Sequence, residues 1–114
     1  MKKCDNHEKE WLQHHYNMWN EIVEALKKDS STDIDIVKRQ YIQRHNLEDA
    51  AVICNCFLCD LYACAKCPLY YKQGGACGSV QPYNLFAIAS DQDTKYSRVD
   101  AAEEIRDCVI NWRY

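Results

Sequence analysis

Apolar residues recur at helical spacing near the start of the chain. Over residues 7–28 they are separated by three, four or seven positions, which is the period of an amphipathic helix. These residues are Trp11, Leu12, Met18, Trp19, Ile22, Val23 and Leu26. Lys27 and Lys28 suit the negative end of a helix dipole, and the serines that follow break the pattern. The sequence therefore predicts a long helix over 7–28, followed by a turn.

Two further helices are predicted before the middle of the chain. Thr32 with Asp35 approximates a capping box and predicts a helix that runs towards His45 with a thin apolar stripe. Asn46, followed by acidic residues, resembles the N-cap of another helix that leads into the sequence AAVICNC.

The C-terminal part of the chain again has helical patterns. Pro82 suits the first turn of a short helix over 83–90, which the sequence DQDT ends. Ser97 with Asp100 begins a final helix, and apolar residues keep helical spacing from there to the terminus. No segment reads as a strand. The predicted fold class is mainly α, a small helical domain with long terminal helices that pack together.

The segment between these helices is expected to be an irregular cysteine-rich loop module. All glycines and prolines of the chain fall within residues 68–82, which predicts loop structure there. With 114 residues the chain is one small domain, because two domains would each be too small to bury a core. We expect a helical region over 1–53, a metal-binding module over 54–83 and C-terminal helices over 84–114.

Composition and charge narrow the functional classes. Hydrophobic residues make up 47% of the chain and charged residues 27%, as in folded proteins, and the net charge of −3 supplies no strong field for duplex DNA. The N-terminus lacks the apolar core of a signal peptide. The most apolar window, residues 50–65, is interrupted by Asn55 and Asp60 and is shorter than the roughly 20 residues of a membrane helix. We therefore expect no membrane association and a cytoplasmic location, where clustered cysteines favour metal or redox chemistry over disulfides.

The cysteine spacing predicts a metal site. Two C-x2-C pairs are followed by one more cysteine, and the candidate ligands are Cys56, Cys59, Cys64, Cys67 and Cys77. This spacing lets two thiolates of each pair converge on one ion, and four thiolates suit tetrahedral Zn²⁺. Only four residues separate the pairs, which excludes a common zinc ribbon. Which four of the five cysteines coordinate stays open.

An iron–sulfur cluster is the chief alternative cofactor. Cys59-x4-Cys64-x2-Cys67 matches the first three ligands of a plant-type [2Fe–2S] loop, but that loop belongs to a β-rich domain and this chain reads as helical. Cys54 and Cys108 lie beside apolar residues on predicted helices, and packing is the favoured interpretation for both.

The chain has the layout C56-x2-C59, C64-x2-C67-P68-L69, C77 and P82-Y83, followed by a closing helix. This layout resembles that of small uncharacterised cysteine-rich proteins of bacteria and their phages. The resemblance covers roughly the second half of the chain. It implies a zinc-binding module and a phage origin, and it carries no settled activity. The N-terminal helical region lies outside it.

Histidines offer a second candidate metal site. His7, His14 and His15 lie on the first predicted helix, with His7 and His14 on nearly the same face. On a helix this rich in charge, histidines at the solvent edge are the favoured interpretation.

Catalytic patterns are weak. A deaminase needs a glutamate two residues after a histidine or cysteine, together with P-C-x2-C, and the chain lacks both. A nucleophilic pair of Cys77 and His45 has nothing in the sequence to bring its members together.

We therefore predict a non-enzymatic small zinc-binding protein that acts as a macromolecular interaction module, with another protein as its partner. If phage-encoded, it would be an accessory protein that modulates host machinery in the host cytoplasm. Self-association is a further option, because Trp11, Trp19 and Trp112 offer more aromatic surface than a small core needs.

Two alternative functions remain. One is single-stranded nucleic-acid binding, in which tyrosines of the cysteine-rich segment stack on bases beside Lys66 and Lys72. The other is an iron–sulfur redox protein.

Overall fold

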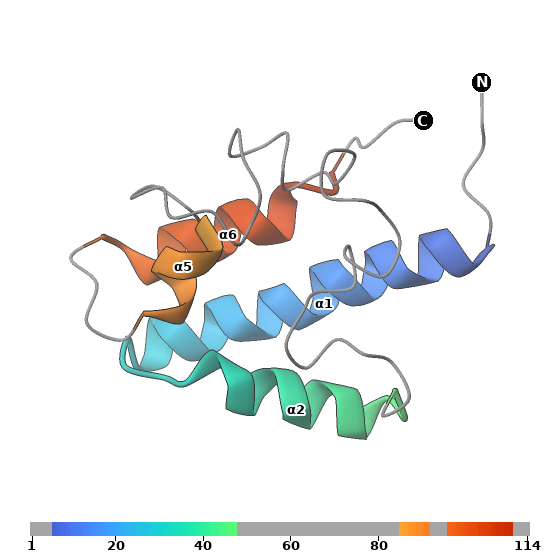
Figure 1. Cartoon of the computed structure of the whole chain (residues 1–114), viewed down its shortest axis with the longest axis horizontal. Coiled ribbons are helices and arrows are strands. Elements are labelled where there is room, and N and C mark those ends of the chain that lie inside the picture. The colour runs from blue at the N-terminus through green and yellow to red at the C-terminus, as the bar shows by residue number, and fades with distance from the viewer. Residues whose placement is uncertain (1–5, 48–84, 92–95, 111–114) are drawn as a thin grey trace.

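The computed structural model describes residues 6–47, 85–91 and 96–110. In these ranges the chain forms the helices α1 (Asn6–Lys28), α2 (Ile34–Arg44), α5 (Leu85–Ser90) and α6 (Arg98–Asp107), and no strand (Figure 1). The predicted mainly α fold class is confirmed. The predicted metal-binding module over 54–83 lies outside the described residues.

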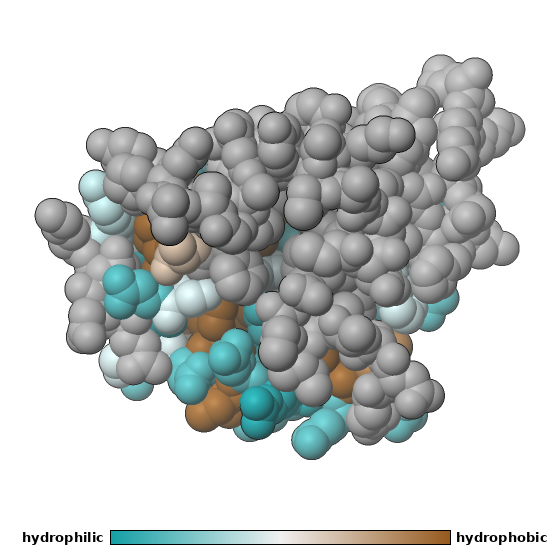
Figure 2. All heavy atoms as spheres, in the orientation of Figure 1, coloured by the Kyte–Doolittle hydropathy of each residue, from teal (hydrophilic) through white to brown (hydrophobic). Residues whose placement is uncertain are grey.

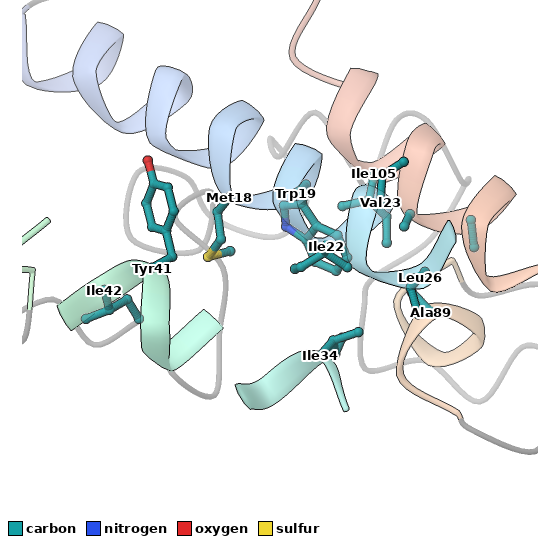
Figure 3. Close-up of a cluster of buried hydrophobic side chains, with 12 residues drawn as sticks. Met18, Trp19, Ile22, Val23, Leu26, Ile34, Tyr41, Ile42, Ala89 and Ile105 are labelled. Carbon is teal, nitrogen blue, oxygen red and sulfur yellow. The ribbon is translucent and has the colours of Figure 1, made fainter. Parts of the chain in front are cut away.

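Helix α1 occupies the centre of the arrangement, with α2 packed along one side, α6 along another, and α5 against α6 (Figure 1). Five of its large apolar side chains are at most 1% exposed, namely Met18, Trp19, Ile22, Val23 and Leu26. They meet residues of all three other helices in one core, namely Ile34, Tyr41, Ile42, Ala89, Ala101, Ala102 and Ile105 (Figure 3). Each large side chain buried in this way stabilises the fold by about 1.5–3 kcal/mol. The long helix and the packing of the two terminal helices are as predicted.

The turn between α1 and α2 uses a different cap from the one predicted. Asp33 is the N-cap of α2, and its carboxylate accepts a hydrogen bond from the backbone N–H of Asp35 at 3.0 Å. The hydroxyl of Thr32 instead donates to the carbonyl oxygen of Asp29 at 2.6 Å. Because that hydroxyl closes the turn after α1, the next polar residue caps α2.

Asn46 ends α2 and does not cap a new helix. Its φ of 56° is left-handed, whereas an N-cap has an extended backbone. Its N–H donates to the carbonyl oxygen of Gln43 at 3.2 Å, and the N–H of Leu47 donates to that of Ile42 at 2.8 Å. These two bonds form a Schellman motif, in which asparagine is the usual substitute for glycine. The remainder of the helix predicted after Asn46 lies beyond the described residues.

The C-terminal helices begin as predicted, but α6 is shorter than expected. The hydroxyl oxygen of Ser97 accepts from the backbone N–H of Asp100 at 3.1 Å, which confirms the cap. Helix α6 ends at Asp107, and the N–H of Ile110 donates to the carbonyl oxygen of Asp107 at 3.0 Å in a turn. The N–H of Cys108 donates to the carbonyl oxygen of Ile105 at 3.4 Å, so the chain tightens here into the three-residue spacing that commonly ends a helix. The expected continuation over residues 108–110 is therefore wrong.

Arg98 ties α6 to two other parts of the fold. Its side chain is buried, and Nε donates to the carbonyl oxygen of Ala89 in α5 at 3.0 Å. Nη1 donates at 2.6 Å to the carbonyl oxygen of Ser30, in the turn after α1. A cation thus satisfies carbonyl groups near two helix C-termini, where positive charge is favoured.

Apolar side chains also reach the surface. Figure 2 shows hydrophobic and hydrophilic residues next to one another on the face that it displays. Three large apolar side chains are exposed among the residues described, Ile36 (54%), Tyr96 (40%) and Ile110 (52%). No helix in these ranges combines the length and apolar character that crossing a bilayer requires.

The position of Arg98 gives a first prediction. Arg98→Ala should lower the free energy of unfolding by about 3 kcal/mol, because one buried and one partly buried carbonyl group lose a charged donor. Arg98→Lys should lose much of the same stability, since one ammonium does not reproduce the two-armed geometry. Urea unfolding measures both. The exposed Arg39→Ala, on α2, is the matched control and should change stability by less than about 0.5 kcal/mol. Equal effects of Arg98→Ala and Arg39→Ala would contradict this role.

Candidate functional site

The predicted zinc ligands Cys56, Cys59, Cys64, Cys67 and Cys77 all lie outside the described residues. The structure describes Cys108, which is partly buried and packs against the core, as predicted. Within the described ranges, no three histidine, cysteine, aspartate or glutamate side chains lie close enough to hold a metal ion. His14 and His15 therefore form no metal site with other described residues, and the side chain of His7 falls outside them.

His14 and His15 occupy two different interfaces of α1 and not its solvent edge. Neighbours in a helix point about 100° apart, so the two rings diverge. His14 approaches Tyr41 of α2, and His15 approaches Ile105 of α6. The expectation of solvent-exposed histidines is wrong because α1 is covered on both of these sides.

The ring of His14 is part of an aromatic cluster between α1 and α2. Its Nδ1 lies 2.7 Å from the hydroxyl oxygen of Tyr41, and its ring makes edge contacts with Trp11 and His45 at centroid distances of 5.8 and 5.6 Å. Its Nε2 lies 3.8 Å from a carboxylate oxygen of Glu10. Burial and then His45 lower the pKa of His14 from 6.5, against the opposing effect of Glu10. The neutral imidazole is therefore the favoured form at neutral pH.

His15 is fully buried, and its surroundings fix its tautomer. Nε2 lies 2.7 Å from the carbonyl oxygen of Ile105. A carbonyl oxygen only accepts, so Nε2 carries the hydrogen and donates it. Nδ1 then holds a lone pair, and it has no hydrogen-bond partner among the described residues. Burial, and secondarily the nearby charge of Lys38, lower the pKa of His15 to about 4 although the bond to Ile105 opposes this shift.

This tautomer decides the chemistry of the neighbouring thiol. The Sγ atom of Cys108 lies 3.7 Å from Nε2 of His15. A histidine that activates a cysteine accepts the thiol proton, which needs a lone pair on the facing nitrogen. Nε2 already carries a hydrogen, so the two residues do not form a nucleophilic pair.

Sequence reasoning missed a lysine in the core. Lys38 is 1% exposed, and its Nζ lies 5.4 Å from the centroid of a ring of Trp19. The attraction between an ammonium and an aromatic face stabilises this position. A signal was present in the sequence, because Lys38 lies between Ile34 and Tyr41 on one face of α2. Lysine is usually exposed, so residue type alone points away from burial at this position.

A groove of about 620 Å³ lies between α1 and the turn after α6. Its lining residues are Lys9, Leu12, Gln13, Tyr16, Val109 and Ile110. The groove combines half-buried apolar side chains with the exposed Ile110 and the cation of Lys9. Its size is within the range of small binding sites in proteins.

One wall of this groove is fixed by Arg106. The guanidinium carbon lies 5.6 Å from the ring centroid of Tyr16, and Nη1 donates to Asn20 Oδ1 at 3.0 Å. Asp107 accepts from two nitrogens of the same group, at 2.7 and 3.1 Å. A planar cation held on several sides keeps the Tyr16 ring in place. The groove is therefore a preformed surface, and it is the candidate binding site of the described helices.

Comparison of the chain with protein-family models, with curated proteins and with solved structures found no match.

The buried His15 predicts a dependence of stability on pH. An unfolded histidine titrates near 6.5 and the folded one near 4, so between these values the unfolded state binds more protons. The contribution of His15 is complete above pH 6.5 and is lost as the pH falls towards 4, a total of about 3 kcal/mol.

The control for this prediction is His15→Gln, which retains an N–H donor and does not titrate. Urea unfolding of both proteins from neutral to acidic pH gives a difference curve in which contributions from metal and from other groups cancel. We expect wild type to lose stability relative to His15→Gln on acidification. Parallel pH profiles would refute the neutral buried imidazole.

Proposed function

We propose that this protein is a structural zinc protein that acts by binding another protein. The observation that carries the proposal is the cysteine pattern, two C-x2-C pairs followed by Cys77 within one short segment. Thiolates at this density favour a soft or borderline metal ion, and Zn²⁺ suits four of them without redox chemistry. At Cys108, the C-cap of α6, His15 does not serve as a base, because its Nε2 donates to the carbonyl oxygen of Ile105.

Zinc binding would add to the free energy of folding, which is small for a helical core of this size. A chain of 114 residues is a small domain, and binding of a structural zinc ion contributes directly to the free energy of folding. Four thiolates also leave no open coordination position for a catalytic water. A closed site of this kind favours a binding role over hydrolysis.

The groove beside Ile110 is the surface that we assign to the partner. Its apolar side chains match an apolar segment, and Lys9 adds a positive charge at the same place. The partner would therefore present apolar side chains next to a carboxylate. The resemblance to small phage and bacterial proteins suggests a host protein as the source of that segment.

Metal analysis with cysteine variants tests the zinc proposal. Protein purified under anaerobic conditions should be colourless and contain about one zinc ion per chain by elemental analysis. Cys56→Ser and Cys67→Ser should lose most of this zinc, and the melting temperature should fall by more than about 5 °C. Cys108→Ser is the control and should keep the metal. Brown protein with visible absorption would favour an iron–sulfur cluster and contradict zinc, as would full zinc binding by both ligand variants.

Photo-crosslinking tests the groove. A benzoylphenylalanine at Gln13, in the groove, should form an adduct with a protein in the source cell, and Ile110→Asp should abolish it because a charge disrupts apolar contact. The same probe at Gln40, exposed on α2, is the control and should give no such adduct. Ile36→Asp, which alters another exposed isoleucine, should leave the Gln13 adduct intact. An adduct removed by nuclease would indicate nucleic-acid binding instead, and an adduct unaffected by Ile110→Asp would contradict this docking surface.

A further inference from the structure

Two histidines meet where the end of α2 lies on α1. His45 is the C-cap of α2, and its ring stacks on Tyr41 with the centroids 4.2 Å apart. The ring of His14 from α1 makes an edge contact with both of these rings, at centroid distances of 5.6 Å from His45 and 5.7 Å from Tyr41. Figure 3 shows Tyr41 pointing from α2 towards α1, so its hydroxyl reaches the Nδ1 of His14. Three aromatic rings thus join the last turn of α2 to α1.

Other charged groups face the same place from both helices. Glu10 lies beside His14 on α1, and its side chain is 62% exposed, so water weakens its effect on the imidazole. On α2, Arg44 lies 5.8 Å above the Tyr41 ring and is paired with Glu21 of α1. The carboxylate of Glu21 is thus already engaged by Arg44. Glu10 is therefore the charged group that opposes the effect of His45 on His14.

The arrangement tolerates two neutral imidazoles better than two charged ones. Neutral rings stack and make edge contacts, and the lone pair of the His14 Nδ1 can accept the hydrogen of the Tyr41 hydroxyl. After protonation Nδ1 becomes a donor, so the hydroxyl has to reverse its role. Two imidazolium rings at this distance also repel each other, because like charges within one site disfavour joint ionisation.

We propose that His14 and His45 form an acid-sensitive latch, which holds the last turn of α2 on α1 at neutral pH and releases it on acidification. The released part would include the Schellman motif at Asn46 and Leu47, which depends on the carbonyl groups of that turn. The latch would therefore control the C-terminal end of α2. This inference does not depend on the metal or the partner proposed above.

The titration of His14 has the direction that the latch needs. Burial and the neighbouring His45 lower the pKa of His14 below 6.5, so the folded state favours the neutral ring. A histidine with a lowered folded pKa contributes its full stability above about pH 6.5 and loses it as the pH falls through the folded value. The latch is therefore closed at neutral pH and opens in acid.

Amide hydrogen exchange by NMR on the full-length, zinc-supplemented protein tests the latch. Between about pH 7.5 and about pH 5.5, after correction for intrinsic rates, the protection of amides in residues 41–47 should fall, because the lowered pKa of His14 removes stability on acidification. His14→Gln combined with His45→Gln removes both rings but keeps His15, so in acid this variant should lose less protection in residues 41–47 than the wild type does. An equal loss in wild type and variant would overturn the proposal.

If the double variant folds poorly, a second measurement on a single variant tests the same proposal. In His45→Gln alone, the NMR-measured pKa of His14 should rise towards 6.5, since one of its two lowering influences is gone. An unchanged pKa would show that the two rings are not coupled and would overturn the latch. All variants keep the eight cysteines, and zinc content is measured at each pH. Metal release in acid would thus affect wild type and variant alike, so its effect on amide protection can be distinguished from opening of the latch.

Discussion

The described structure depends on the burial of α1 against α2 and α6 at the same time. A surface helix buries one stripe of its circumference, but α1 buries residues that face both neighbours, from Met18 and Trp19 to Leu26. This double contact forces polar residues of α1 into interfaces. His14 and His15 are adjacent in sequence, and each lies against a different helix.

Polar groups in these interfaces specify how the helices dock. His15 reaches one carbonyl group of α6, and Arg98 reaches carbonyl groups of α5 and of the turn after α1. A buried polar group without a partner is expensive, so shifts of α6 along α1 that break these bonds are penalised. Apolar packing supplies the driving force, and these few hydrogen bonds select one arrangement.

Periodicity predicted the helices because it reports which face of each helix is buried. The bounds of α1 could be predicted from this periodicity, and the Ser97 cap of α6 from the residue types at its start. The cap of α2 could not, because Thr32 and Asp33 are both good caps and only the folded turn decides between them. Asn46 is ambiguous for a similar reason, since asparagine suits both an N-cap and a left-handed helix end.

Buried charge was the other limit of sequence reasoning. Lys38 and Arg98 look like surface residues in a pattern of apolar and polar positions, and their burial follows from partners that lie far away in sequence, such as Trp19 and Ser30. The groove beside Tyr16 also brings together residues near the two ends of the chain. The cysteine site stays a prediction from spacing, because its five candidate ligands lie outside the described residues.

The central functional claim is a closed thiolate site attached to this helical core. X-ray absorption at the zinc edge of the purified protein tests it most directly, because it reports the ligand atoms around the metal. The account predicts a shell of sulfur atoms only, with zinc–sulfur distances of about 2.3 Å. A shell containing nitrogen or oxygen ligands, or a protein that holds no zinc, would contradict it.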